Sequence, residues 1–116
     1  IAWMKTYQPR MEKRVELGMR PDDPGPIKDK KVREALRATN LPIVEEGIQN
    51  LQKALAIDPQ YDDAMAYMNL LHRERADLAD NADEYKKEVA EADSWVDKTL
   101  ATKKAKTEKA GKKAAE

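Results

Sequence analysis

The chain contains no cysteine and no phenylalanine, and it has a single histidine and a single serine among 116 residues. Without cysteine, disulfide bonds and thiolate metal sites are excluded. Zinc sites and nucleophilic triads need clusters of histidine, cysteine or serine, which His72 and Ser94 alone do not supply. The four glycines lie too far apart for a loop that cradles a phosphate. We therefore expect no enzyme activity, no cofactor and no metal site.

Large aliphatic residues are also scarce, with 9 leucines, 5 isoleucines and 5 valines against 17 alanines. Alanine favours helix and allows helices to approach closely. A chain of this size with so few large apolar side chains buries only a thin core. We expect it to need a neighbouring polypeptide for full stability.

No stretch approaches the roughly 20 apolar residues that a membrane-spanning helix needs, so we expect no membrane span. No signal peptide is visible, although the chain begins with Ile1 and is expected to be a processed or truncated product.

Charge is abundant and balanced, with 22 basic and 22 acidic residues. Residues 101–116 hold six lysines and two glutamates, which leaves a body with 16 basic and 20 acidic residues. The zero net charge argues against a nucleic-acid partner. An acidic body and a basic tail can attract another copy of the same chain.

Apolar spacing predicts four helices, at about residues 1–18, 28–57, 61–79 and 82–102. Residues 20–27 hold three prolines and a glycine, which predicts a loop. Pro9 should kink the first helix or begin a new one. Pro42 leaves two readings: one long bent helix, which we favour, or a second helix capped by Asn40.

Residues 101–116 form a lysine- and alanine-rich tail after a helical domain at 1–100. Their composition allows helix, but they have no apolar face of their own, which is typical of disorder. The lysines are expected to be solvated or to contact an acidic protein surface. The tail has no aromatic residue for base stacking.

A repeat motif lies at the junction of the second and third helices. Gly47, Leu51, Ala54 and Pro59 have the spacing of the small, large, small and closing proline positions in the second helix of a tetratricopeptide repeat. The segment LQKALAIDPQYDDA resembles the junction between two such repeats. Small residues there let the two helices of a repeat touch, and the proline ends the second helix.

The next repeat would begin at Asp62, with Met65, Met68 and Leu71 as its packing residues. Asn69 stands where the family usually has glycine, and His72 where it usually has tyrosine. Its second helix would be 85–100. The motif is clear over residues 43–79. Upstream, Ile1–Trp3 resembles the end of another first helix, which makes residues 4 to about 40 a long insertion.

The resemblance implies an all-α fragment of a solenoid, built from antiparallel helix hairpins with a groove that binds protein. Members that grip chaperone C-termini carry lysine, asparagine and arginine at positions held here by Asp63, Ala66, Tyr67 and Leu70, so that activity is not expected. The chain also resembles certain bacterial repeat proteins, and this resemblance implies a location outside the cytoplasm or at the cell surface.

Two polar features have simple structural explanations. His72 is expected to be a packing residue because it is alone on its helix. Asp58, Asp62 and Asp63 do not have the spacing of a calcium loop, and we interpret them as charges that favour a helix start.

Two hypotheses for function follow. A solenoid with so few repeats and no clear cap presents apolar ends, and unlike ends favour head-to-tail association into a ring or a filament. The alternative is a binding module, a fragment of a longer repeat protein that holds a peptide or protein in its groove. Trp3 and Tyr7 are expected to lack a partner upstream in the chain. The candidate interface comprises Trp3, Tyr7, Tyr85, Trp95, Lys103, Lys104 and Lys106.

Overall fold

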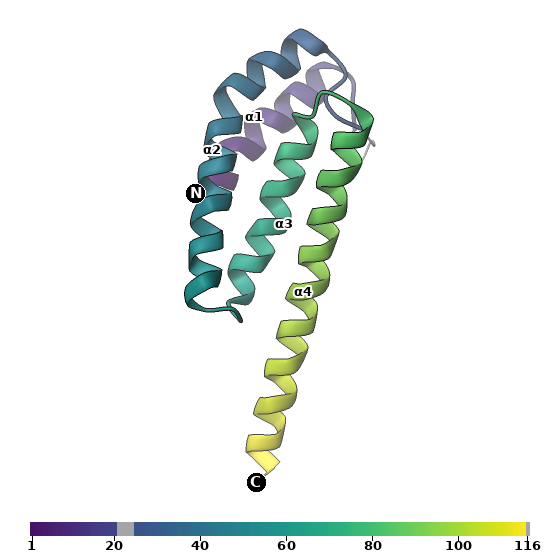
Figure 1. Cartoon of the computed structure of the whole chain (residues 1–116). Coiled ribbons are helices and arrows are strands. Elements are labelled where there is room, and N and C mark those ends of the chain that lie inside the picture. Colours follow the sequence, from purple (N-terminus) through teal and green to yellow (C-terminus); the bar gives the residue numbers. More distant parts are fainter. Residues whose placement is uncertain (21–24, 116) are drawn as a thin grey trace.

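The computed structural model describes residues 1–20 and 25–115, and this part of the chain consists of four helices without a strand (Figure 1). They are α1 (Ala2–Glu16), α2 (Lys30–Ile57), α3 (Asp62–Asp77) and α4 (Ala82–Ala115). The predicted all-α class is confirmed. Of the predicted loop at 20–27, residues 21–24 lie outside the described residues.

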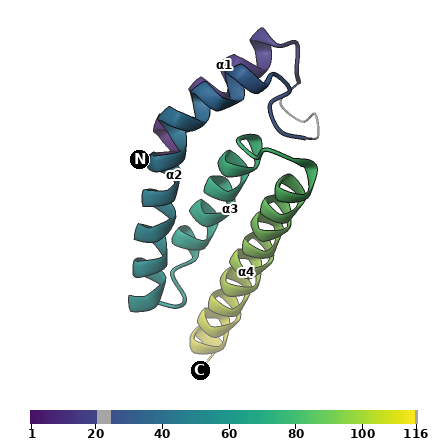
Figure 2. The same cartoon turned by 45° about the horizontal axis from the view of Figure 1, so that its top comes forward.

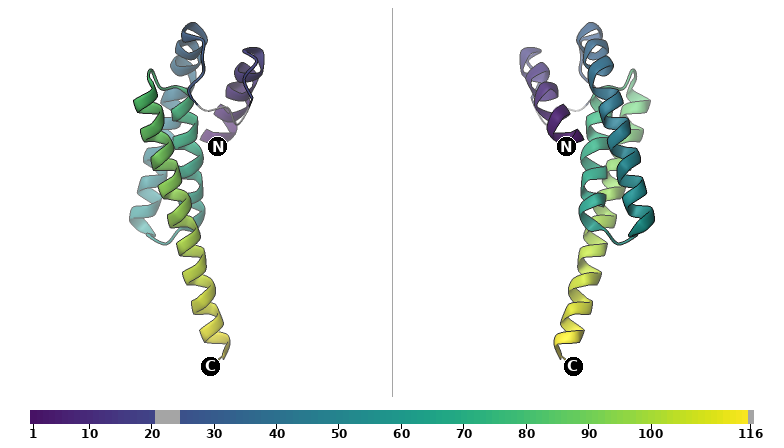
Figure 3. Two further views of the ribbon diagram at one scale, coloured as in Figure 1. Left: turned by 90° about the vertical axis from the view of Figure 1, so that its right-hand side faces the viewer. Right: turned by 90° about the vertical axis from the view of Figure 1, so that its left-hand side faces the viewer.

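Helices α2, α3 and α4 run antiparallel to one another in chain order, and α3 and α4 form the most extensive pair. Helix α1 crosses the upper halves of α2 and α3 and contacts both (Figure 2). The molecule is elongated, 60 × 25 × 24 Å, because the C-terminal part of α4 projects beyond the other helices (Figure 3).

Both prolines inside predicted helices are accommodated without a break. α2 continues through Pro42, and Figure 1 shows it as one bent helix. Proline removes an amide donor and crowds the preceding carbonyl, which bends a helix that tertiary contacts keep intact. Of the two readings for this region, the single long bent helix is therefore the observed one. α1 likewise continues through Pro9.

Local signals set the limits of α1 and α2. After α1, Gly18 adopts a φ of 72°, and the amide of Met19 donates to the carbonyl of Arg14 over 2.8 Å. This left-handed glycine ends the helix in the manner of a Schellman motif. Asp29 begins α2, because its carboxylate accepts a hydrogen bond of 3.0 Å from the amide of Val32.

The core has two parts. In the first, Val44 and Ile48 of α2 meet Met68 and Leu71 of α3. In the second, Ile27 of the loop packs with Leu36 and Leu78, and its amide donates to the carbonyl of Asp77 over 3.1 Å. Ile27 is completely buried, so this end of the proline-rich segment is anchored to the bundle.

The segment after residue 100 is helical rather than disordered, because α4 continues to Ala115. Alanine and lysine extend a helix at little cost once it has been nucleated. Lys103 and Lys106 also bind Asp62 at the start of α3, over 3.0 and 3.2 Å. Composition pointed to disorder because it shows neither the preceding helix nor this distant carboxylate.

Gly47 provides the first test of the fold. A Cβ at this position would lie 2.7 Å from the Cβ of Ala2 and 2.9 Å from Cδ1 of Leu71. Gly47→Ala should therefore lower the free energy of unfolding by about 1–2 kcal/mol, since overpacking outweighs the gain in helix propensity. Gly111→Ala is the matched control, because it also lies in a helix but has nothing within 4 Å. Urea denaturation measures both variants, and equal effects would contradict the close contact at Gly47.

Candidate protein-binding groove

A hollow of about 410 Å³ lies where the start of α1 meets the middle of α2 and of α3. Most of its walls are apolar, with a lysine, a glutamate and an asparagine among them. The lining residues are Ile1, Ala2, Trp3, Lys5, Ile43, Glu46, Gly47, Asn50, Leu51, Tyr67 and Leu71. We call this hollow the α1 groove.

Apolar side chains at the α1 groove are exposed to solvent. Ile1 is 85% exposed and Tyr67 is 46% exposed. On the adjoining turns of α1, Met4 and Tyr7 are exposed as well. The Tyr7 ring stacks on Trp3 with centroids 4.8 Å apart. Exposed apolar groups gathered in one place mark surfaces that bind other molecules.

The floor of the α1 groove depends on the absence of a side chain at Gly47. Ala2 and Leu71 fill the space that a Cβ would occupy there. This contact brings α1 and α3 against the same turn of α2. The close approach expected from the repeat motif is therefore present, and it involves α1 as well as the neighbouring helix α3.

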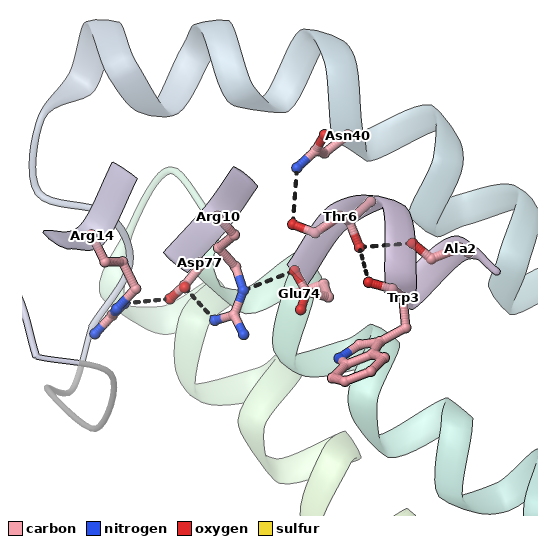
Figure 4. Close-up of polar contacts among 8 residues, drawn as sticks. All are labelled: Ala2, Trp3, Thr6, Arg10, Arg14, Asn40, Glu74 and Asp77. Carbon is pink, nitrogen blue, oxygen red and sulfur yellow. Dashed lines mark hydrogen bonds and ion pairs between the residues drawn. The ribbon is translucent and has the colours of Figure 1, made fainter. Parts of the chain in front are cut away.

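Helix α1, which forms one wall, is held to the bundle mainly by polar side chains. Its buried residues are Thr6, Arg10 and Arg14. Figure 4 shows both arginines pointing to α3. Arg10 binds Asp77 and pairs through Nε with Oε2 of Glu74 at 2.8 Å, and NH1 of Arg14 binds Oδ1 of Asp77 at 2.8 Å. We call these four residues the α1–α3 ion cluster.

A second polar contact ties α1 to α2 (Figure 4). The side-chain amide of Asn40 donates to the carbonyl of Thr6 over 3.5 Å, and Asn40 is buried. The hydroxyl of Thr6 donates to the carbonyl of Ala2 over 2.9 Å. Helix α1 is therefore tied to α2 as well as to α3.

Glu74 is the member of the α1–α3 ion cluster whose pKa departs from its usual value. Burial raises its pKa to about 7, while the positive charge of Arg10 acts in the opposite direction. Its Oε1 atom is buried and has no hydrogen-bond partner among the described residues. The folded chain therefore favours a protonated Glu74 more than the unfolded chain does.

The residues predicted to pack in the repeat lie mainly between helices. Met65, Met68 and Leu71 of α3 are buried. On α2, Leu51 and Ala54 are half-buried, and Pro59 follows the end of the helix as expected. Of these, Gly47, Leu51 and Leu71 line the α1 groove.

The candidate interface residues do not form one surface. Trp3 and Trp95 both pack against the first core cluster, and Tyr85 is half-buried on α4. Trp3 therefore packs within the chain against helices that follow it in sequence, because α1 folds back onto α2 and α3. Of the three lysines, Lys103 and Lys106 bind Asp62, and Lys104 is exposed.

The α1–α3 ion cluster was not predicted from the sequence. One signal was present: Arg10 and Arg14 are one helical turn apart, and Glu74 and Asp77 have the matching spacing on α3. Such spacing is also common on solvated helix faces. Only the folded arrangement shows that these two pairs face each other.

His72 and Asp62, the two polar residues interpreted from the sequence as structural, lie at a helix interface and at a helix start. His72 is buried against α4, and its Nδ1 lies 2.8 Å from Oε2 of Glu88. Asp62 occupies the first turn of α3. Hydrogen bonds from Lys103 and Lys106 lower the pKa of Asp62 to about 2.

Within residues 1–20 and 25–115, no group of three metal-ligating side chains has the geometry to hold an ion.

Comparisons of the whole chain with protein-family models, with curated proteins and with solved structures found no match. The tetratricopeptide resemblance therefore stays a prediction. Among residues 1–20 and 25–115, no helix combines the length and the apolar composition that a transmembrane span requires.

The raised pKa of Glu74 predicts a dependence of stability on pH. Because its pKa rises from 4.5 to about 7 on folding, the folded state binds more protons within that interval. The free energy of unfolding should decrease as the pH rises from 4.5 to 7, by at most about 1.4 kcal/mol per pH unit from this group. Glu74→Gln should remove that part of the slope in urea titrations. Equal slopes for the variant and the parent chain would contradict the assignment.

Proposed function

We propose that this chain is a protein-interaction module without catalytic activity, which holds an apolar segment of a protein partner in the α1 groove. The observation that carries the proposal is the exposure of Tyr67 beside a mainly apolar hollow, which Trp3, Ile43 and Leu51 also line. The free energy of such a chain decreases when a partner covers these apolar groups.

The size and lining of the α1 groove suit a short stretch of polypeptide. Its volume of about 410 Å³ falls within the range of about 300–1,000 Å³ that is typical of specific binding sites. Tyr67 and Trp3 bring aromatic surface, which is frequent among the residues that dominate protein interfaces. A few apolar side chains of a partner would fill this space.

Polar residues in the wall of the α1 groove would fix the orientation of a bound polypeptide segment. Lys5 on α1 and both Glu46 and Asn50 on α2 lie along the α1 groove. Their side chains supply donors and acceptors for the amide and carbonyl groups of a bound segment. A partner with apolar side chains and an accessible backbone matches this lining better than a purely aliphatic ligand does.

Head-to-tail self-association, the other function suggested by the sequence, is the second candidate. It is favoured by the apolar face of α1, where Ile1, Met4 and Tyr7 are exposed. It requires a complementary apolar surface on α4, the last helix in the stack. On the described part of α4, Leu100 is the one large apolar side chain that is exposed. We therefore rank this candidate below the binding module.

A matched pair of isoleucines tests the proposed site. Ile1 and Ile57 are 85% and 87% exposed, but only Ile1 lines the α1 groove. Peptides selected from a random library against the immobilised chain should be rich in apolar residues. Ile1→Ser and Tyr67→Ser should each weaken their binding at least about tenfold, the equivalent of 1.4 kcal/mol, whereas Ile57→Ser should not.

Fluorescence anisotropy with labelled library peptides measures these affinities, and circular dichroism checks that each variant remains helical. A library that yields no binder, or binders that respond equally to Ile1→Ser and Ile57→Ser, would contradict the proposal.

A further inference from the structure

One oxygen of the buried Glu74 carboxyl has no hydrogen-bond donor. Glu74 is 1% exposed, and its Oε2 atom pairs with Nε of Arg10 at 2.8 Å. Its Oε1 atom is buried as well and has no partner within residues 1–20 and 25–115. An ionised oxygen in such a place has lost its hydration without replacement, which is costly. The position therefore favours a carboxyl group that carries its own proton.

The hydroxyl of Thr6 on α1 can accept a hydrogen bond from such a group. Thr6 is completely buried and acts on the Glu74 carboxyl from the side of α1 (Figure 4). A hydroxyl has one proton to donate and two lone pairs. Thr6 donates its proton to the carbonyl of Ala2 over 2.9 Å, with a longer contact of 3.4 Å to the carbonyl of Trp3. Its oxygen is therefore an acceptor for Glu74, and a proton on Oε1 completes the hydrogen bonding of both side chains.

The charges around Glu74 remain paired when its carboxyl is neutral. Arg10 of α1 and Asp77 of α3 are the charged groups that act on this carboxyl. Arg10 also binds Asp77, as does Arg14, so protonation of Glu74 leaves each arginine with an acidic partner. Helix α2 contributes the uncharged Asn40 to the same turn of α1. Helix α4 has no contact with α1 among the described residues, and the acidic residues through which it binds α3 are paired with other side chains.

The hydrogen bond that Thr6 donates also reaches the floor of the α1 groove. Its acceptor is the carbonyl of Ala2, and the Cβ of Ala2 fills the space beside Gly47. An ionised Oε1 of Glu74 would compete with this carbonyl for the Thr6 proton. The protonation state of Glu74 is therefore linked to the start of α1, where the groove is formed.

We propose that Glu74 retains a proton in the folded chain, donates it in a hydrogen bond to Thr6, and thereby makes the docking of α1 on α3 depend on pH. When α1 detaches, Glu74 meets water and ionises at its ordinary pKa of 4.5, whereas burial raises this pKa to about 7. The contribution of Glu74 to docking is therefore full below pH 4.5 and is lost as the pH rises through 7. The proposal concerns the docking of α1, so it stands whether or not the α1 groove binds a partner.

Infrared spectroscopy of the full chain detects the proton directly, because a protonated carboxyl has a C=O stretching band that a carboxylate lacks. At about pH 6, the difference spectrum between the parent chain and Glu74→Gln should contain this band, since carboxyl groups with ordinary pKa values are largely ionised there and cancel. Absence of the band from the difference spectrum would overturn the proposal.

Substitutions at Thr6 identify the acceptor. Thr6→Val keeps the shape of the side chain and removes the hydroxyl, so it should shift or abolish the C=O band of Glu74. Thr6→Ser keeps the hydroxyl and should leave the band in place, and circular dichroism checks that both variants remain helical. A band that is the same in Thr6→Val as in the parent chain would exclude Thr6 as the acceptor and overturn the proposal.

Hydrogen exchange measures the effect of the proton on α1. In the parent chain, protection of the α1 amides, corrected for intrinsic exchange rates, should decrease at least about tenfold between about pH 5 and about pH 7.5. Glu74→Gln should lose this decrease, because its side-chain amide can donate to Thr6 at every pH. Glu91→Gln on α4 removes an exposed carboxylate and is the matched control, which should retain the decrease. Protection of α1 that is independent of pH in the parent chain, or that decreases equally in Glu74→Gln, would overturn the proposal.

Discussion

The position of α1, and with it one wall of the α1 groove, depends on the attachment of α1 to α3 through buried arginines and carboxylates. Helix α1 buries Thr6, Arg10 and Arg14, and its large apolar side chains Met4 and Val15 remain exposed. Its docking therefore rests on ion pairs to Glu74 and Asp77, with a small apolar contribution from Ala2 and Trp3. A buried pair of this kind adds little net stability, but removal of one partner typically costs about 3–5 kcal/mol.

This mode of attachment explains how the groove can remain apolar and open. If α1 were held by an apolar stripe, that stripe would be covered by the bundle, and little apolar surface would remain on α1 for a partner. Here the ion cluster fixes the second half of α1, which leaves Ile1 and Met4 at its start exposed beside the hollow. The wall of the proposed binding site therefore depends on charges roughly two to three helical turns away.

Much of the fold could be predicted from the sequence, because the apolar spacing, the proline-rich loop and the Asp58–Pro59 boundary are local signals. The contact at Gly47 was also accessible, since its spacing to Leu51 and Ala54 indicated a helix pair in close contact. The position of α1 was not predicted. It depends on Arg10 and Arg14 meeting Glu74 and Asp77 across more than 60 residues of chain, and each pair alone resembles an ordinary solvated face. The same reason explains why Lys103 and Lys106 were assigned to an interface, when a distant carboxylate binds them within the chain.

Hydrogen exchange of the backbone amides in Asp77→Asn tests the central claim most directly, because this substitution keeps the shape of the side chain and removes the charge that both arginines bind. The account predicts that amides of α1 lose protection while those of the paired helices α3 and α4 keep most of theirs. Unchanged protection in α1, or an equal loss throughout all four helices, would contradict the claim that the ion cluster specifically holds α1 in place.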